Sequence, residues 1–233
     1  MRSEKQIKKW TTENAMDRTR GNSIPPSYPN EVMVKIFSSS EYSSGFSPID
    51  PGSSVLDVGC AFGNNLVYFL DRDCVGYGID VTNDMVNLAK GNLKRLGYDD
   101  VKIEKGSNEA IPFPDRSFDI LISVNTLHYS QGIVGINKAL AEFSRVVTNG
   151  GKVFIMTAGP RHKIVQNSKR HNLLDWEVLD FGFRTSDRLS FFDDTVHFKT
   201  VLSEHFDNVE VGSLTEDYST STLDFMFSMC NNK

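Results

Sequence analysis

Two acidic residues, Asp57 and Asp80, lie in or at the end of two short apolar stretches. Asp57 lies in the stretch Val55-Leu-Asp-Val58, and small residues follow it at alternate positions, namely Gly59, Ala61 and Gly63. Asp80 ends the second stretch, about twenty residues later. A strand that leads through small residues into a helix brings backbone N–H groups to a ligand, and an acid at the end of the next strand commonly binds ribose hydroxyls. This spacing predicts a site for a nucleoside cofactor.

Alternating strands and helices are expected to position these acids. The pattern predicts strands over 55–58, 75–80, 101–104, 118–124 and 152–157, and helices over 64–70, 83–96 and 132–147. The helix 83–96 has one broad apolar face and stops before Gly97, and the segment 118–124 is apolar almost throughout, as in a parallel strand buried on both faces. An α/β fold with a doubly wound, mostly parallel sheet follows, with ligands beyond the carboxyl ends of the strands.

The two ends of the chain lack this alternation. Residues 1–50 are predicted to be a helical cap and linker, with helices over 5–17 and 29–37 around an irregular, proline-containing segment at 21–29. After residue 158 the sequence is polar as far as 180, with helix-compatible and loop stretches, and then aromatic and partly extended over 181–192. A helix capped by Asp193 or Asp194 is expected to run to Phe206, with Val196, Val201 and Leu202 also facing inward, before two closing strands at 209–213 and 222–229.

Composition excludes several classes of protein. The 233 residues carry a net charge of −5, which gives no basic footprint for nucleic acid. No run of ~18 apolar residues predicts a membrane span, and residues 1–10 lack an apolar signal core. The three cysteines, Cys60, Cys74 and Cys230, have no metal-ligand spacing. We therefore expect a cytoplasmic protein with free thiols and no metal, which binds a small molecule and is a monomer or homodimer.

Five segments in register resemble the class I S-adenosylmethionine-dependent methyltransferases. They are Val55-Leu-Asp-Val-Gly-Cys-Ala-Phe-Gly63, Gly78-Ile-Asp80, Ile111-Pro-Phe-Pro-Asp115 with Ser117-Phe-Asp119, Ser123-Val-Asn-Thr-Leu-His128, and Arg145-Val-Val-Thr-Asn-Gly-Gly151. The resemblance implies a Rossmann-like, seven-stranded sheet with helices on both faces and an N-terminal or inserted cap. It divides the chain into a cap and linker at 1–50 and a methyltransferase domain at 51–233, with a substrate-specific insertion at about 158–195.

The resemblance also implies a cofactor site for S-adenosylmethionine and its product S-adenosylhomocysteine. Asp57 is expected near the amino-acid end of the cofactor, Asp80 on the ribose, and Val81 and Met85 beside the adenine. The full set implied for the cofactor is Asp57, Gly59, Cys60, Ala61, Gly63, Asp80, Val81, Met85, Ser107, Asn108 and Asn125. Two positions depart from the family pattern, because Ala61 replaces a usual glycine and Ser107 replaces an acid that often binds the adenine amino group.

Two alternatives to an active methyltransferase remain at this stage. A nicotinamide-dependent oxidoreductase would have the pattern G-x-G-x-x-G after the first strand, whereas this chain has glycine, alanine and glycine at alternate positions. A methyltransferase-like binding subunit without catalysis is the other alternative, and only the replacements at Ala61 and Ser107 favour it. The absence of an Asn/Asp-Pro-Pro-Tyr/Phe motif after the fourth strand disfavours a nucleic-acid methyltransferase.

Residues for the acceptor are expected outside the common core. His128 and His162 are the candidate bases, since an alcohol acceptor must lose a proton, although either could be structural. Tyr28, Tyr129, Arg161 and Arg184 are the candidate substrate-binding residues. The segments Tyr28-Pro-Asn-Glu31, Arg161-His-Lys163 and Phe181-Gly-Phe-Arg184 resemble, less specifically, methyltransferases of bacterial surface-polysaccharide biosynthesis. This implies O-methylation of a sugar or sugar nucleotide.

Overall fold

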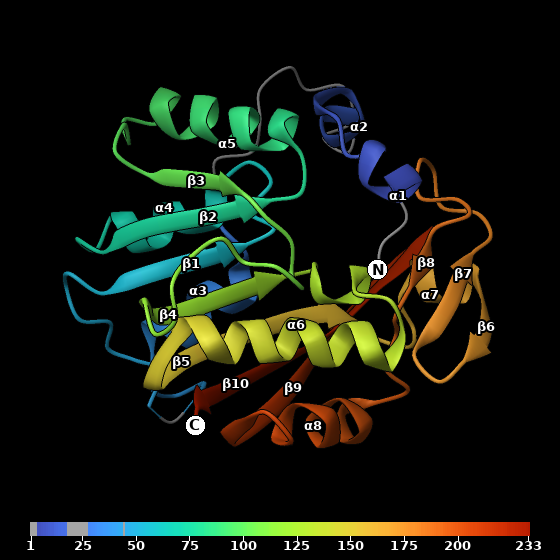
Figure 1. Ribbon diagram of the computed structural model, residues 1–233. Helices are drawn as coiled ribbons and strands as arrows, with labels where there is room; N and C mark the ends of the chain where they lie inside the picture. Colours follow the sequence, from blue (N-terminus) through green and yellow to red (C-terminus); the bar gives the residue numbers. More distant parts are fainter. Residues whose placement is uncertain (1–3, 18–27, 44) are drawn as a thin grey trace.

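The computed structural model describes residues 4–17, 28–43 and 45–233, and its centre is a seven-stranded sheet (Figure 1). The strand order is β3-β2-β1-β4-β5-β10-β9. Five strands are parallel: β1 (Ser54–Val58), β2 (Val75–Asp80), β3 (Lys102–Lys105), β4 (Phe118–Val124) and β5 (Val147–Ala158). The strand β10 (Ser221–Asn232) lies antiparallel between β5 and β9 (Phe206–Tyr218). The predicted fold class is confirmed.

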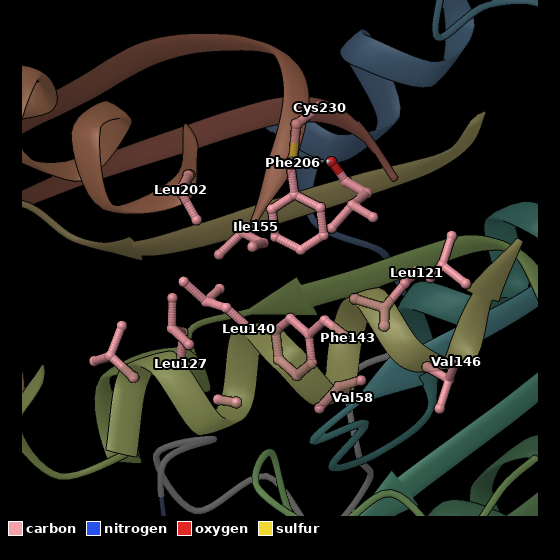
Figure 2. Close-up of a cluster of buried hydrophobic side chains, with 14 of the residues drawn as sticks. Val58, Leu121, Leu127, Leu140, Phe143, Val146, Ile155, Leu202, Phe206 and Cys230 are labelled. Atoms are coloured by element: carbon pink, nitrogen blue, oxygen red, sulfur yellow. Dashed lines mark hydrogen bonds between the residues drawn. The ribbon is translucent and has the colours of Figure 1, made fainter. Parts of the chain in front are cut away.

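Helices cover both faces of this sheet. On one face, α6 (Gly132–Val146) and α8 (Thr195–Ser203) enclose a core in which Leu140 and Phe143 pack with Ile155 and Phe206 (Figure 2). On the other face, α3 (Glu31–Ser38), α4 (Asn64–Leu70) and α5 (Asn83–Arg95) enclose a second core. The two packed faces hold the carboxyl ends of β1, β2 and β4 in place, and the acids predicted from the sequence stand at these ends.

The region after β5 contains a small second sheet that the sequence reading missed. The segment 159–189 forms the short helix α7 (Lys163–Gln166) and three antiparallel strands, β6 (Ser168–Asn172), β7 (Asp175–Val178) and β8 (Arg188–Leu189). Its strands are mostly polar and partly exposed, so they lack the apolar alternation that identifies a strand in a sequence. This small sheet lies beyond the carboxyl ends of the parallel strands (Figure 1).

Three further boundaries differ from the prediction. The closing strands are much longer than 209–213 and 222–229, because β9 and β10 continue to pair through polar residues as far as Tyr218 and Ser221. The helix α8 ends at Ser203 rather than Phe206, and Val196 is 72% exposed rather than inward. Val201 and Leu202 are buried as expected, together with Phe198. The irregular segment expected at 21–29 lies mostly outside the described residues.

The helix expected over 5–17 is broken into α1 (Glu4–Lys8) and α2 (Thr12–Asp17). The break lies at Trp10, whose carbonyl accepts a hydrogen bond from Thr82 Oγ1 at 2.9 Å. Residues 4–17, here called the N-terminal strap, extend from α5 to the small sheet (Figure 1). At the far end Gln6 Nε2 donates to the carbonyl of Arg188, and Lys9 Nζ donates to Asp187 Oδ1 at 2.7 Å. Tertiary contacts therefore override helix propensity at the break.

Within the described part of the chain, no helix has both the length and the apolar character needed to cross a membrane.

Candidate active site

The turn between β1 and α4 has a left-handed backbone at three positions. Gly59, Ala61 and Gly63 have φ values of +74°, +49° and +72°. The amides of Gly59 and Cys60 both donate to the carbonyl of Ile79, at 2.8 and 2.9 Å, and the amide of Gly63 donates to the carbonyl of Cys60. Since these N–H groups are already bonded, small residues are needed here for the backbone conformation and for close approach of a ligand, not to donate hydrogen bonds to it.

Ala61 is the only residue of the three with a side chain. A left-handed conformation costs a non-glycine residue about 1 kcal/mol. Its amide donates to Asp80 Oδ2 at 2.9 Å, and this charge-assisted bond holds the conformation. The departure from the family's usual glycine is therefore compatible with the shape of the turn.

Asp80 is buried at the end of β2, where it connects two segments of the site. Besides the bond from Ala61, its Oδ1 accepts the amide of Val81 at 2.7 Å. An ionised carboxylate has about four lone-pair positions, so these two bonds do not exhaust the acceptor capacity of Asp80. This arrangement is compatible with the ribose contact expected of Asp80.

Asp57 is the most unusual group in the site. It is 1% exposed, and neither carboxylate oxygen has a hydrogen bond of normal geometry to any described residue. Burial, and secondarily the charge of Asp80, raises the pKa of Asp57 to about 8, and the nearby amide of Asn65 opposes the rise. Buried carboxylates are normally hydrogen-bonded, so two orphaned oxygens indicate a place for a donor ligand.

Asn125 presents a third orphaned acceptor at the same edge of the sheet. It follows β4, has a φ of +57°, and its Oδ1 is buried without a hydrogen-bond partner among the described residues. Thr126 Oγ1 donates to the carbonyl of Val58 at 3.0 Å, which ties the end of β4 to the end of β1. Asp57 and Asn125 thus supply hydrogen-bond acceptors from neighbouring strands, and Asp57 gains a negative charge when it ionises. These two side chains fit an ammonium group such as the one at the amino-acid end of S-adenosylmethionine.

The residues expected around the adenine lie on α5 and in the loop after β3. Met85 is fully buried and packs in one apolar cluster with Phe62 and with Ala15 of the strap. Ser107 pairs with Ala110 through backbone hydrogen bonds. Asn108 Nδ2 donates to the carbonyl of Thr126 at 2.8 Å and to Ser130 Oγ, which leaves its amide oxygen as an acceptor. The contacts of Val81, Met85, Ser107 and Asn108 with adenine stay predictions.

The two histidines differ in their suitability as bases. His162 Nδ1 accepts the amide of Ile164 at 3.1 Å and caps α7, so the proton of the neutral ring is on Nε2. Burial, and then the charge of Arg184, lowers the pKa of His162 to about 4. His128 lies on the short 3-10 helix η1 (Leu127–Tyr129) directly after β4, with Nδ1 3.3 Å from Thr157 Oγ1. The roles of His128 and His162 as bases stay predictions.

Only two of the four candidate substrate-binding residues come together. Arg184 donates from Nη1 to the hydroxyl of Tyr129 at 3.2 Å. The side chain of Arg161 is 62% exposed and is 3.3 Å from Asp217 on β9. The side chain of Tyr28 is exposed, although its carbonyl accepts a bond from Asn64 at the start of α4.

Trp10 and Phe183, which belong to the two regions outside the common core that were expected to choose the substrate, join Arg184 and Tyr129. The ring of Trp10 packs edge-to-face against Tyr129 and Phe183, with centroids 5.3 and 5.4 Å apart. A tryptophan in a polar N-terminal segment was the only sequence signal for this contact, and no local pattern links residue 10 to residue 183.

In the part of the chain that is described, no group of three His, Cys, Asp or Glu residues could hold a metal ion.

Residues 56–155 match the family model described as a methyltransferase domain. The methyltransferase YdaC from Bacillus subtilis is 31% identical over 160 residues, which cover 67% of this chain and 81% of YdaC. Fatty-acid O-methyltransferase from Mycolicibacterium smegmatis is 30% identical over 115 residues, 48% of this chain and 40% of that protein. The chain covers 38–40% of the length of the first three curated relatives it matches.

The solved structure of the YcgJ protein from Bacillus subtilis has the same fold, with a TM-score of 0.63. The superposition covers 87% of this chain and 97% of YcgJ, at 16% identity. At that identity the likeness shows the fold alone.

Proposed function

Because this chain belongs to the class I S-adenosylmethionine-dependent methyltransferases, we propose that it methylates an oxygen atom of a small molecule, a sugar or a sugar nucleotide. S-adenosylmethionine, when bound, supplies a methyl group on a positively charged sulfur. The observation that carries the cofactor part of the proposal is Asp57, whose two buried carboxylate oxygens have no hydrogen bond of normal geometry to any described residue. Such a group is costly unless a ligand donates to it.

The acids at the ends of β1 and β2 are proposed to bind the cofactor through groups other than the sulfur and its methyl group. Asp57 and Asn125 take the ammonium, and Asp80 takes the ribose hydroxyls. A strong anion beside the sulfur would stabilise the charged ground state more than the transition state, in which this charge is dispersed, and would slow the reaction. Carboxylates on the ammonium and on the ribose hydroxyls bind the cofactor without placing an anion directly beside the sulfur.

The acceptor is proposed to bind between η1 and the small sheet. His128 on η1 accepts the proton of the acceptor hydroxyl as its oxygen attacks. Attack requires the two reacting atoms at about 3–3.5 Å and the exclusion of water. The strap, which packs Ala15 on Met85 and Trp10 on Tyr129, covers both the cofactor side and the acceptor side of this region.

Two observations support an oxygen atom on a sugar-like molecule as the acceptor. Aromatic rings and a guanidinium surround Tyr129, a lining that suits a sugar ring with polar substituents. One relative bears the name fatty-acid O-methyltransferase, so O-methylation occurs among the matched proteins. The weaker resemblance to enzymes of bacterial surface-polysaccharide synthesis adds the sugar class.

Product analysis with labelled cofactor tests the proposal. The purified protein is incubated with methyl-labelled S-adenosylmethionine and a panel of sugars, sugar phosphates, sugar nucleotides and small alcohols. We expect label on a hydroxyl oxygen of a sugar or sugar nucleotide, and loss of turnover in His128→Ala. Label on nitrogen, sulfur or carbon, or only on acceptors without a sugar, would refute the proposed acceptor class. Protection from thermal unfolding by NAD(H) but not by S-adenosylhomocysteine would refute the methyltransferase itself.

A further inference from the structure

We propose that Arg184 binds an anionic group of the acceptor, a phosphate or a carboxylate, and so selects charged acceptors over neutral ones. This inference rests on the proposed function, because it assigns a chemical class to the acceptor of the same reaction. It assigns recognition to one side chain of the small-sheet region and does not depend on which hydroxyl is methylated.

The guanidinium of Arg184 is partly buried and poorly satisfied. Its Nε is buried and has no hydrogen-bond partner, and the bond from Nη1 to Tyr129 is the one hydrogen bond its side chain makes among the described residues. No salt bridge joins it to a carboxylate of the described chain. Other arginines of the region have such partners: Arg188 pairs with Asp175, and Arg170 pairs with Asp193.

Aromatic rings hold this guanidinium in a fixed orientation. Its central carbon lies 4.7 Å from the ring centroid of Phe181 and 5.7 Å from that of Phe183. Cation–π contacts of this kind stabilise the charge but do not use its N–H donors. A planar fork of donors held against aromatic faces is preorganised for a bidentate oxyanion, because little rotamer entropy remains to be lost on binding.

No carboxylate of the described residues forms an ion pair with Arg184. Arg184 lies near His162, since its charge contributes to the lowered pKa of that ring. Asp224 also acts on His162, but both of its oxygens are engaged: Oδ2 accepts the amide of Arg161, and Oδ1 accepts the hydroxyl of Thr215. A partly buried cation with no counter-ion among the described residues is expected to take one from the ligand.

The position of Arg184 connects this anion site to the proposed chemistry. Tyr129, its hydrogen-bond partner, is adjacent to His128 on η1, and their rings are 4.6 Å apart. The turn that carries Arg184 also carries Asp187, which pairs with Lys9 of the strap. An acceptor whose anionic group lies on Arg184 therefore extends toward the proposed base and under the strap.

The anion site is tested first by binding, without turnover. Thermal unfolding is followed at constant ionic strength with S-adenosylhomocysteine present, and with inorganic phosphate, pyrophosphate or acetate as the probe. At ten times its dissociation constant a probe is expected to raise the Tm of the wild type by about 3 °C. Arg184→Met should abolish the rise, whereas the control Arg170→Met, which removes an exposed arginine that already has a carboxylate partner, should retain it. No rise in the wild type, or an equal rise in Arg184→Met, would overturn the proposal.

Turnover then separates the two sources of the anion. Methyl glucoside, glucuronic acid, glucose 1-phosphate and UDP-glucose are compared as acceptors with labelled cofactor. A charged acceptor should exceed the neutral glycoside in kcat/KM, and Arg184→Met should lower kcat/KM for it by about 10–100-fold, the equivalent of a lost charge-assisted bond. Whichever of the carboxylate acceptor and the phosphate acceptors has the higher kcat/KM identifies the anionic group that Arg184 binds. If none of the four acceptors is methylated but the probes still raise the Tm in an Arg184-dependent way, the sugar acceptor is refuted and the anion site is not. A higher kcat/KM for methyl glucoside than for the charged acceptors would refute the anion site.

Discussion

Replacement of Gly59 by alanine is expected to destabilise the protein by about 3 kcal/mol, the sum of a left-handed backbone and a steric clash. Gly59 has a φ of +74°, and an added Cβ would lie 2.3 Å from Thr126 Cγ2 and 2.9 Å from Thr126 Cβ. Thr126 cannot move away freely, because its hydroxyl bonds the carbonyl of Val58 and contacts Ser123. Chemical denaturation measures the loss, and binding of S-adenosylhomocysteine should be lost with it.

Gly150→Ala is the matched control, since Gly150 also has a φ of +74° but no atom lies within 4 Å of its added Cβ. It should lose only the backbone contribution, about 1 kcal/mol. Thr126→Ser in the Gly59→Ala background removes the closest methyl group and keeps the hydroxyl, so it should recover part of the stability. Equal losses for the two alanine variants would show that Thr126 does not restrict the turn.

Binding of S-adenosylhomocysteine at pH 7 is expected to release close to one proton. The pKa of Asp57 is raised to about 8 in the protein alone, so its carboxyl is mostly protonated at pH 7. An ammonium at its oxygens favours the ionised form and lowers that pKa. Affinity should therefore rise by up to about tenfold per pH unit between pH 6 and 8 and then level off. Calorimetry in buffers of different ionisation enthalpy measures the proton count.

The same group gives the free protein a stability that depends on pH. The folded pKa of about 8 lies above the ordinary value of 3.8, so the folded state binds more protons than the unfolded state between these limits. Stability is then fully present below pH 4 and falls as pH rises toward 8. Asp57→Asn should flatten this fall and reduce the proton release to near zero. A wild type that releases no proton at pH 7 would show that Asp57 does not meet the ammonium.

The turn between β1 and α4 and the position of Asp80 at the end of β2 were predictable because their signals are local. Gly59, Ala61, Gly63 and Asp80 lie within two short motifs, and the strand and helix between them follow from hydrophobic periodicity. The backbone of the turn explains why small residues recur there, since each of them occupies a left-handed position. The orphaned oxygens of Asp57 were not predictable, because burial without a partner depends on what the other strands leave open.

The acceptor side was only partly predictable because its contacts are long-range. Lys9 pairs with Asp187 across 178 positions of the sequence, and Trp10 packs on Phe183, while neither pair has a pattern in the intervening chain. Arg161 and Arg184 look equivalent in the sequence, as cations near aromatic residues. Folding separates them: the strand β9 gives Arg161 the partner Asp217, whereas Arg184 is enclosed by rings and has no carboxylate partner in the described chain.

Calorimetric titration of the purified protein with S-adenosylhomocysteine tests directly whether the β1–β2 edge of the sheet binds this cofactor. We expect saturable binding at one site per chain. Asp80→Asn should weaken it by about 1–3 kcal/mol, the value of a hydrogen bond to a charged group, while leaving the unfolding transition cooperative. No binding by the folded wild type would contradict the assignment of the β1–β2 edge to this cofactor, and unchanged affinity in Asp80→Asn would remove Asp80 from the ribose.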